Sequence, residues 1–165
     1  MKAKVVCEEF KNAVLKTERC VGKNLSLPVL SNILVLVKED GVCLRATNLS
    51  IGIEIKIKAE TQEEGVIAVD PIVLKSVLSG LEGGMEIDIE ETEGNLVLKT
   101  NKSEYLIKGV SFDDFPTLPQ KSGEIFNIDP EDIALGIRKV SFSSSLSDIK
   151  PEIASVYIYS DANKL

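Results

Sequence analysis

An α+β fold of paired β-α-β-β-β repeats is predicted by three features of this 165-residue sequence. A strand pattern runs directly into a helix-start signal three times, in "KVVCEEFKNAVLKTE", "IAVDPIVLKSVLSGL" and "FNIDPEDIALGIRKV". Three strand patterns then follow each of the first two helices. A unit of about 60 residues buries too little surface to be stable alone, so two units are expected to pair. We therefore expect one two-layer domain over residues 1–122, with the sheet outside and the two helices side by side.

The first repeat, residues 1–62, opens with a short apolar strand and continues into a helix expected near residues 8–20. Cys7 stands at the cap position of this helix, and two glutamates in its first turn complement the helix dipole. Three strands follow in "NILVLVKEDGVCLRATNLSIGIEIKIKAE", with an acidic-glycine turn at Asp40-Gly41. The alternation in "IGIEIKIKA" directs one face of the last strand toward the core and the other toward water.

The second repeat, residues 63–122, has the same order with a stronger helix start. Asp70 is a favourable N-cap residue, and Pro71 takes the first helical position, where its missing N–H costs nothing. Apolar residues at helical spacing predict a helix over residues 71–81. The stretch "MEIDIEETEGNLVLKTNKSEYLIKGV" then supplies three more strands, with a turn at Glu93-Gly94. The two repeats together give about eight strands.

The third copy, residues 123–165, is expected to be the incomplete start of a second domain. Asp129 and Pro130 repeat the capping signal, and the stretch "SVYIYSDANKL" adds strand and turn signals, so one helix and two strands are expected. The apolar side of this helix is formed by Ile133, Ile137 and Val140. Since no complementary repeat follows, we expect this segment to be either mobile or covered by a neighbouring chain.

The composition excludes several classes of enzyme. The sequence contains no histidine, which excludes Ser-His-Asp and Cys-His nucleophiles and histidine-ligated metals. It also lacks the glycine patterns that bind nucleotide phosphates. Asp113 and Asp114 leave a carboxylate-based hydrolase as an alternative, but adjacent aspartates before Phe-Pro favour a turn. We expect no catalytic residue, no metal and no cofactor.

The cysteine pattern and the N-terminus both indicate a cytoplasmic protein. Cys7, Cys20 and Cys43 are odd in number and lack metal-ligand spacing, which fits a reducing compartment. The N-terminal "MKAKVVCEEF" carries charges where a signal peptide has an apolar segment, and no apolar run approaches the roughly 20 residues of a membrane span. We therefore expect neither export nor a membrane partner.

Five stretches occur in the order and spacing of motifs from a known family: "LPVLSNILV", "TNLSIGIEI", "VIAVDPIVLKSVLSGL", "FDDFPTLP" and "SSSLSDIKPEIASVYI". The sequence resembles the N-terminal portion of the bacterial DNA polymerase III β subunit, the replicative sliding clamp. The resemblance implies a clamp-like domain followed by the start of a second one. Members of this family have three such domains per chain, and two chains close into a ring around duplex DNA. The resemblance thus implies a non-catalytic processivity factor whose partners are duplex DNA, the replicative polymerase, a clamp loader and a second copy.

A net charge of −7 agrees with such a ring, because a ring that traps DNA topologically needs only weak phosphate contacts. Acidic residues gather in strands and turns such as "EIDIEETEG" and "ETQEEG". The expected helices carry the cations Lys11, Lys16, Arg19, Lys75, Arg138 and Lys139. These cations are the candidates for sequence-independent DNA contact, and the alternative is that they only solvate a protein surface.

The resemblance implies two further loops near DNA. The connection "VGKNLSLPVL" holds Lys23 and Asn24, and Asn24 replaces a residue that is commonly basic in the family, which predicts a weaker contact. The stretch "FSSSLSDIKPE" offers Ser143, Ser145 and Lys150 as phosphate contacts.

The resemblance also implies protein contacts. It places Val77, Lys102, Tyr105 and Ile107 where the first domain meets the third domain of the other chain, and Ile153 at one wall of the partner-binding cleft. Tyr105 and Ile107 share one strand face, which is consistent with an apolar seam. The alternative function is an interaction or scaffold module that is built from the same repeats and binds no DNA.

Overall fold

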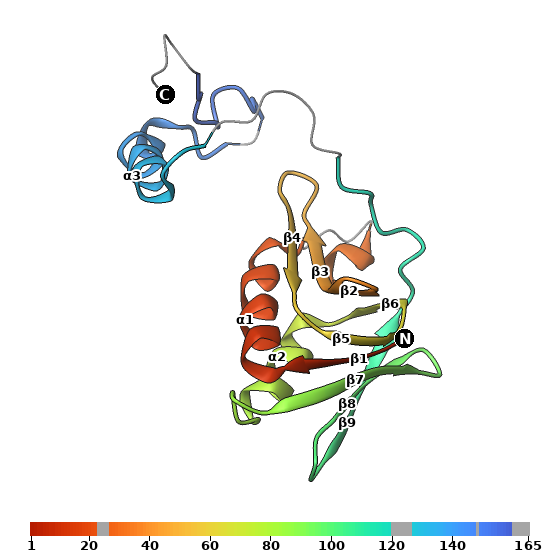
Figure 1. Cartoon of the computed structure of the whole chain (residues 1–165). Helices are drawn as coiled ribbons and strands as arrows, with labels where there is room; N and C mark the ends of the chain where they lie inside the picture. The colour runs from red at the N-terminus through yellow and green to blue at the C-terminus, as the bar shows by residue number, and fades with distance from the viewer. Residues whose placement is uncertain (23–26, 120–126, 148, 160–165) are drawn as a thin grey trace. The chain divides into compact units, whose positions relative to one another are not determined.

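The computed structural model describes residues 1–22, 27–119, 127–147 and 149–159, which fall into two compact units, Met1–Pro119 and Gln120–Leu165 (Figure 1). The predicted domain boundary at residue 122 lies outside the described residues. The assignment of the two units to a first domain and the start of a second one stays a prediction. Within the described ranges, no helix is long and apolar enough to cross a membrane.

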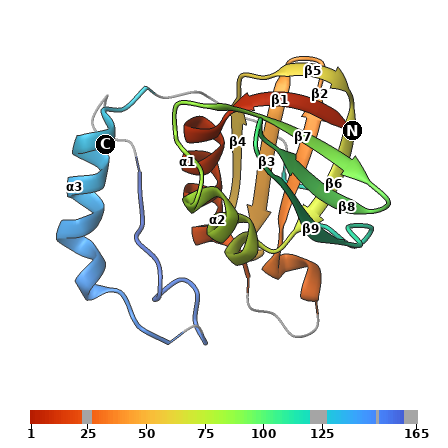
Figure 2. The same ribbon diagram turned by 90° about the horizontal axis from the view of Figure 1, so that it is seen from below.

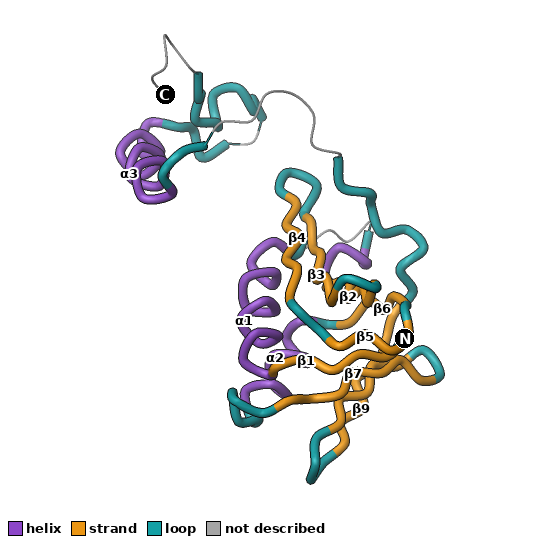
Figure 3. The backbone as a smooth tube through the Cα atoms, viewed as in Figure 1, coloured by secondary structure: helices purple, strands orange, loops and turns teal. Residues whose placement is uncertain are grey.

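The first unit has the predicted alternation of strands and helices (Figure 3). Its first repeat contains β1 (Lys2–Val6), α1 (Cys7–Thr17), β2 (Ile33–Lys38), β3 (Gly41–Thr47), β4 (Gly52–Ile57) and β5 (Glu60–Glu63). Its second repeat contains β6 (Gly65–Val69), α2 (Pro71–Ser79), β7 (Glu86–Thr92), β8 (Asn95–Lys99) and β9 (Glu104–Val110). Two short 3-10 helices, η1 (Glu18–Cys20) and η2 (Pro28–Ser31), lie between α1 and β2.

The strands form one antiparallel sheet in the order β4-β3-β2-β6-β9-β8-β7-β1-β5. Each repeat donates its first strand to the other, because β6 pairs with β2 and β1 pairs with β7. The two ends of the sheet, β4 and β5, are separated in sequence only by Lys58 and Ala59. This exchange confirms the predicted α+β fold of two paired repeats.

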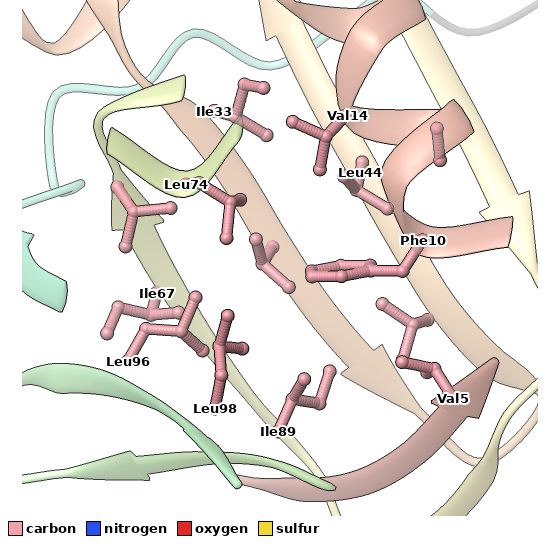
Figure 4. Close-up of a cluster of buried hydrophobic side chains, with 14 of the residues drawn as sticks. Val5, Phe10, Val14, Ile33, Leu44, Ile67, Leu74, Ile89, Leu96 and Leu98 are labelled. Carbon is pink, nitrogen blue, oxygen red and sulfur yellow. The ribbon is translucent and has the colours of Figure 1, made fainter. Parts of the chain in front are cut away.

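The two helices lie side by side against one side of the sheet, as predicted (Figure 2). Phe10 and Val14 from α1 and Leu74 and Leu78 from α2 are all 0% exposed. Figure 4 shows Phe10, Val14 and Leu74 among apolar side chains of the strands, including Ile33, Leu44, Ile89, Leu96 and Leu98. The core therefore depends on both repeats at once, which explains why neither unit of about 60 residues would be stable alone.

The predicted turns and the start of α2 are confirmed. Gly41 and Gly94 have φ angles of 129° and 74°, a backbone region that favours glycine. The Asp70 carboxylate accepts hydrogen bonds from the backbone N–H groups of Ile72 at 2.7 Å and Val73 at 3.3 Å. These bonds satisfy two donors that the first helical turn leaves free.

Three boundaries differ from the sequence prediction. The N-cap of α1 is Val6, without a side-chain cap, and Cys7 is the first helical residue. The α-helix ends at Thr17 because the chain tightens into η1, and α2 ends at Ser79. The acidic stretch from Glu60 to Glu63 forms β5, a ninth strand where about eight were expected, because it pairs with β1.

The second unit contains α3 (Pro130–Val140) and the 3-10 helix η3 (Ser141–Ser143). Asp129 caps α3 as predicted, accepting a hydrogen bond from the Glu131 N–H at 2.8 Å. The two predicted strands are absent from residues 127–147 and 149–159, where the structure describes no strand. A strand needs a neighbour to satisfy its backbone groups, and the described part of this unit supplies none.

Candidate nucleic-acid interface

The first candidate surface is the solvent side of α1 and η1. Because Phe10 and Val14 point into the core, the opposite side of the helix faces water, and it exposes Lys16. Arg19 is also exposed, in η1, whereas Lys11 is half-buried. The structure thus places two predicted cations on an open surface at the C-terminal end of α1, where positive charge also complements the helix dipole.

Lys75, the predicted cation of α2, forms an ion pair with another residue of the chain. Its Nζ lies 2.5 Å from Oε1 of Glu18, the first residue of η1. The lysine side chain is 38% exposed and the glutamate side chain 22% exposed. The ion pair therefore links η1 to α2, and it neutralises Lys75, which is the only cation that α2 contains. The rest of the exposed side of α2 is uncharged and consists of Ile72, Val73, Ser76 and Ser79.

Glu18 was not among the residues that the sequence predicted for this surface. It lies 57 positions from Lys75, and local spacing gives no signal that joins residues so far apart. The contact follows only from the pairing of the two repeats, which brings α1 and α2 together.

Lys23 and Asn24 lie outside the described residues. The chain on either side of them is fixed by a hydrogen bond from the Gly22 N–H to the Leu30 carbonyl at 2.7 Å. A Cβ at Gly22 would approach Leu30 Cβ to 3.1 Å and Asn48 Cα to 3.3 Å, so this position favours glycine. The base of the predicted DNA-reaching loop is therefore well anchored.

The remaining predicted DNA contacts lie in the second unit. Arg138 and Lys139 are exposed in the last turn of α3, and Lys150 is exposed as well. The Ser143 hydroxyl donates to the Val140 carbonyl at 2.7 Å, and the Ser145 hydroxyl accepts from the Ser147 N–H at 3.1 Å. Both serine side chains thus take part in local turns. Ile153, predicted as a wall of a partner cleft, is 53% exposed.

The four residues predicted for contact with the other chain differ in exposure. Tyr105 and Ile107 do share a face of β9, but it is the core face, and Ile107 is only 2% exposed. Val77 also packs against the core, and Lys102 is exposed. The side chain of Ile107 is therefore not available to a partner on this surface, because alternation turns it inward.

The edge of β9 nevertheless remains largely open. Among the described residues, β6 pairs with β9 only at Val110 and Gly109, so the segment from Glu104 to Lys108 has β8 as its one neighbour in that part of the sheet. The outward residue Leu106 is 67% exposed. An open strand edge offers backbone hydrogen bonds to a further strand.

The candidate catalytic groups are held in ordinary structural roles. The Ser111 hydroxyl donates to the Asp113 carboxylate at 2.9 Å, and the Phe115 N–H donates to the Phe112 carbonyl at 2.9 Å, which confirms the predicted turn. Burial raises the pKa of the Cys7 thiol, although Lys11 opposes this effect. In the described part of the chain, no group of three acidic or cysteine residues could hold a metal ion.

Comparisons with known proteins agree with this fold. Residues 1–119 match the family model of the DNA polymerase III beta subunit, N-terminal domain. The beta sliding clamp of Synechococcus elongatus is 27% identical over 161 residues, which cover 94% of this chain and 43% of the relative. The beta sliding clamp of Synechocystis sp. is 28% identical over 173 residues, which cover 98% and 44%.

Solved structures show the same similarity. The beta subunit of Streptococcus pyogenes DNA polymerase superposes with a TM-score of 0.80 at 26% identity, covering 92% of this chain and 42% of that one. The DNA polymerase III subunit beta of Pseudomonas aeruginosa gives a TM-score of 0.82 at 26% identity, covering 91% and 41%. The chain therefore spans less than half the length of the relatives that it matches.

Proposed function

The chain belongs to the DNA polymerase III beta subunit family, and we propose that it forms the N-terminal portion of a sliding clamp that encircles duplex DNA. As a processivity factor, it would tether the replicative polymerase to its template. One observation supports this role above the others. Pairing of the repeats places α1 and α2 side by side, with Lys16 exposed on α1 and Arg19 exposed on η1, while many acidic residues lie on the strands. Such a distribution attracts phosphate to Lys16 and Arg19 near the C-terminal end of α1 and repels it from the acidic strands.

The contact with DNA is weak and independent of sequence. The chain carries a net charge of −7, and the described part of the first unit exposes few cations on its helices. A small number of phosphate contacts releases few counterions, so the affinity depends only moderately on salt. Weak contacts suit a ring, because topology holds the DNA and the protein must slide.

Ring closure would use a second copy, and the open edge of β9 near Lys102 supports this part of the proposal. The polymerase and a clamp loader are the further partners that we propose for the whole protein. We also infer that the chain has no catalytic activity and acts in the cytoplasm, since Asp113 is tied to a turn and its cysteines, Cys7, Cys20 and Cys43, are free.

The proposal is tested by titrating a fluorescently labelled duplex with the chain and measuring anisotropy at several salt concentrations. The double substitution Lys16→Glu/Arg19→Glu should remove most of the binding. The control Lys38→Glu/Lys58→Glu changes the net charge equally at exposed lysines outside the helices. An equal loss of affinity in both variants would mean that the solvent side of α1 and η1 is not the DNA-binding surface. A wild-type chain without any affinity for duplex at low salt would favour a scaffold module.

A further inference from the structure

The Glu18–Lys75 ion pair has a consequence for DNA binding. Glu18 begins η1 directly after α1, and Lys75 lies in the middle of α2. Their side-chain atoms Oε1 and Nζ are 2.5 Å apart, and both side chains retain contact with solvent. The lysine is therefore close enough to the surface to reach a phosphate, but its charge is already matched by a carboxylate.

The Glu18–Lys75 ion pair makes the charge on the exposed surfaces of α1, η1 and α2 unequal. Lys16 and Arg19 supply exposed cations on one helix segment, whereas α2 exposes only uncharged residues beside the paired Lys75. A phosphate that approached α2 would have to displace the Glu18 carboxylate before it could bind Lys75. It would also meet the freed negative charge of Glu18, which lies next to Arg19.

We propose that Glu18 limits the attraction of DNA to the helix side by holding Lys75 in an ion pair, so that α1 and η1 carry the phosphate contacts of this domain. The inference rests on the proposed DNA-binding function. Its physical effect is to keep the number of counterions released on binding low, which keeps the complex weak and mobile along the duplex. Glu18 is thus a residue that sets affinity without touching DNA.

The test compares two substitutions that change the net charge equally. Glu18→Gln removes the carboxylate and frees Lys75. Glu9→Gln removes an exposed carboxylate two turns before Lys16 on the same side of α1, and it frees no lysine, because Glu9 has no ion-pair partner among the described residues. The Glu18–Lys75 pair is partly exposed, and Glu18→Gln keeps the shape of the side chain and its ability to hydrogen-bond, so both variants should fold. Circular dichroism and thermal unfolding verify this before binding is measured.

Duplex affinity is measured by anisotropy between about 50 and 200 mM salt, the range over which counterion release is readily resolved. One additional phosphate contact steepens the slope of log K against log salt by about 0.9. We therefore expect Glu18→Gln to bind more tightly than the wild type, with a gain about threefold larger at the low-salt end than at the high-salt end. Glu9→Gln should raise affinity without changing the slope.

The double variant Glu18→Gln/Lys75→Gln has the net charge of the wild type and should return to its slope. If Glu18→Gln and Glu9→Gln give the same slope, the inference is overturned, while the proposed function stands as long as Lys16→Glu/Arg19→Glu weakens binding. If the wild type and Glu18→Gln both fail to bind duplex at the lowest salt, both the inference and the proposed function fall.

Discussion

At the residue scale, the core is built from equivalent positions of two repeats. Phe10 stands four residues after the cap Val6, and Leu74 stands four residues after the cap Asp70. Both side chains are 0% exposed, and each lies among apolar residues of both repeats (Figure 4). Because each repeat covers the helix of the other, truncating one of these side chains should lower the stability of the whole unit.

Phe10→Ala tests this dependence. Removing a fully buried phenylalanine costs about 3–5 kcal/mol of unfolding free energy, because contacts are lost and a cavity remains. Urea denaturation followed by circular dichroism measures the change. The control Ile72→Ala removes an apolar side chain that is 66% exposed and should change stability by no more than about 0.5 kcal/mol. A small change in unfolding free energy for Phe10→Ala would contradict this dependence, because it would mean that the core tolerates the loss of this side chain.

At the element scale, ion pairs join strands that are distant in sequence. Glu90 of β7 lies 2.7 Å from Lys2 of β1 and 2.6 Å from Lys99 of β8, and its side chain is only 15% exposed. These bonds, first that of Lys2 and then that of Lys99, hold the pKa of the Glu90 carboxyl below its usual value. The carboxylate thus connects the first strand of one repeat to two strands of the other.

This ion pair predicts a pH dependence of stability. Since the folded pKa of Glu90 is lowered, the unfolded chain binds the proton more readily, and acid favours unfolding. The stabilisation is complete above the unfolded pKa, about 4.3, and is lost as the pH falls through the folded pKa. The unfolding free energies of the wild type and Glu90→Gln should therefore differ most above about pH 5 and converge as the pH falls below it.

Glu93→Gln, in the exposed β7–β8 turn, is the matched control for that measurement. Glu93 forms no ion pair among the described residues, so this variant controls for the loss of one negative charge. A pH-independent difference between the wild type and Glu90→Gln would show that the two lysines do not stabilise the Glu90 carboxylate.

The elements also show what the sequence could and could not predict. The start of α2 was predictable because Asp70 and Pro71 act within a single turn. The strand β5 was difficult to predict, since its charged residues give no apolar alternation and it forms by pairing with β1. For the same reason the binding of Lys75 by Glu18 could not be predicted, because it depends on how two repeats pack. Local chemistry is thus readable from the sequence, whereas contacts between repeats require the fold.

At the scale of the whole molecule, the two units differ in how much apolar surface they bury. After their aspartate caps, Leu74 and Leu78 of α2 correspond in sequence to Ile133 and Ile137 of α3. The first two are 0% exposed, whereas Ile133 is half-buried and Ile137 is 41% exposed. In the described residues of its unit, α3 has no second repeat to cover this side.

Hydrogen exchange should reveal this difference. In a dilute sample, the backbone amides of α3 should exchange faster than those of α1, because α3 has no buried residue to resist local opening. The exposed apolar side of α3 corresponds to the side that α1 and α2 bury against the sheet, so a second copy can cover it. We therefore expect protection of α3 to rise with protein concentration, while that of α1 stays constant and serves as the internal control. Equal protection of both helices in a dilute monomer would contradict the prediction, because it would require another part of the same chain to cover α3.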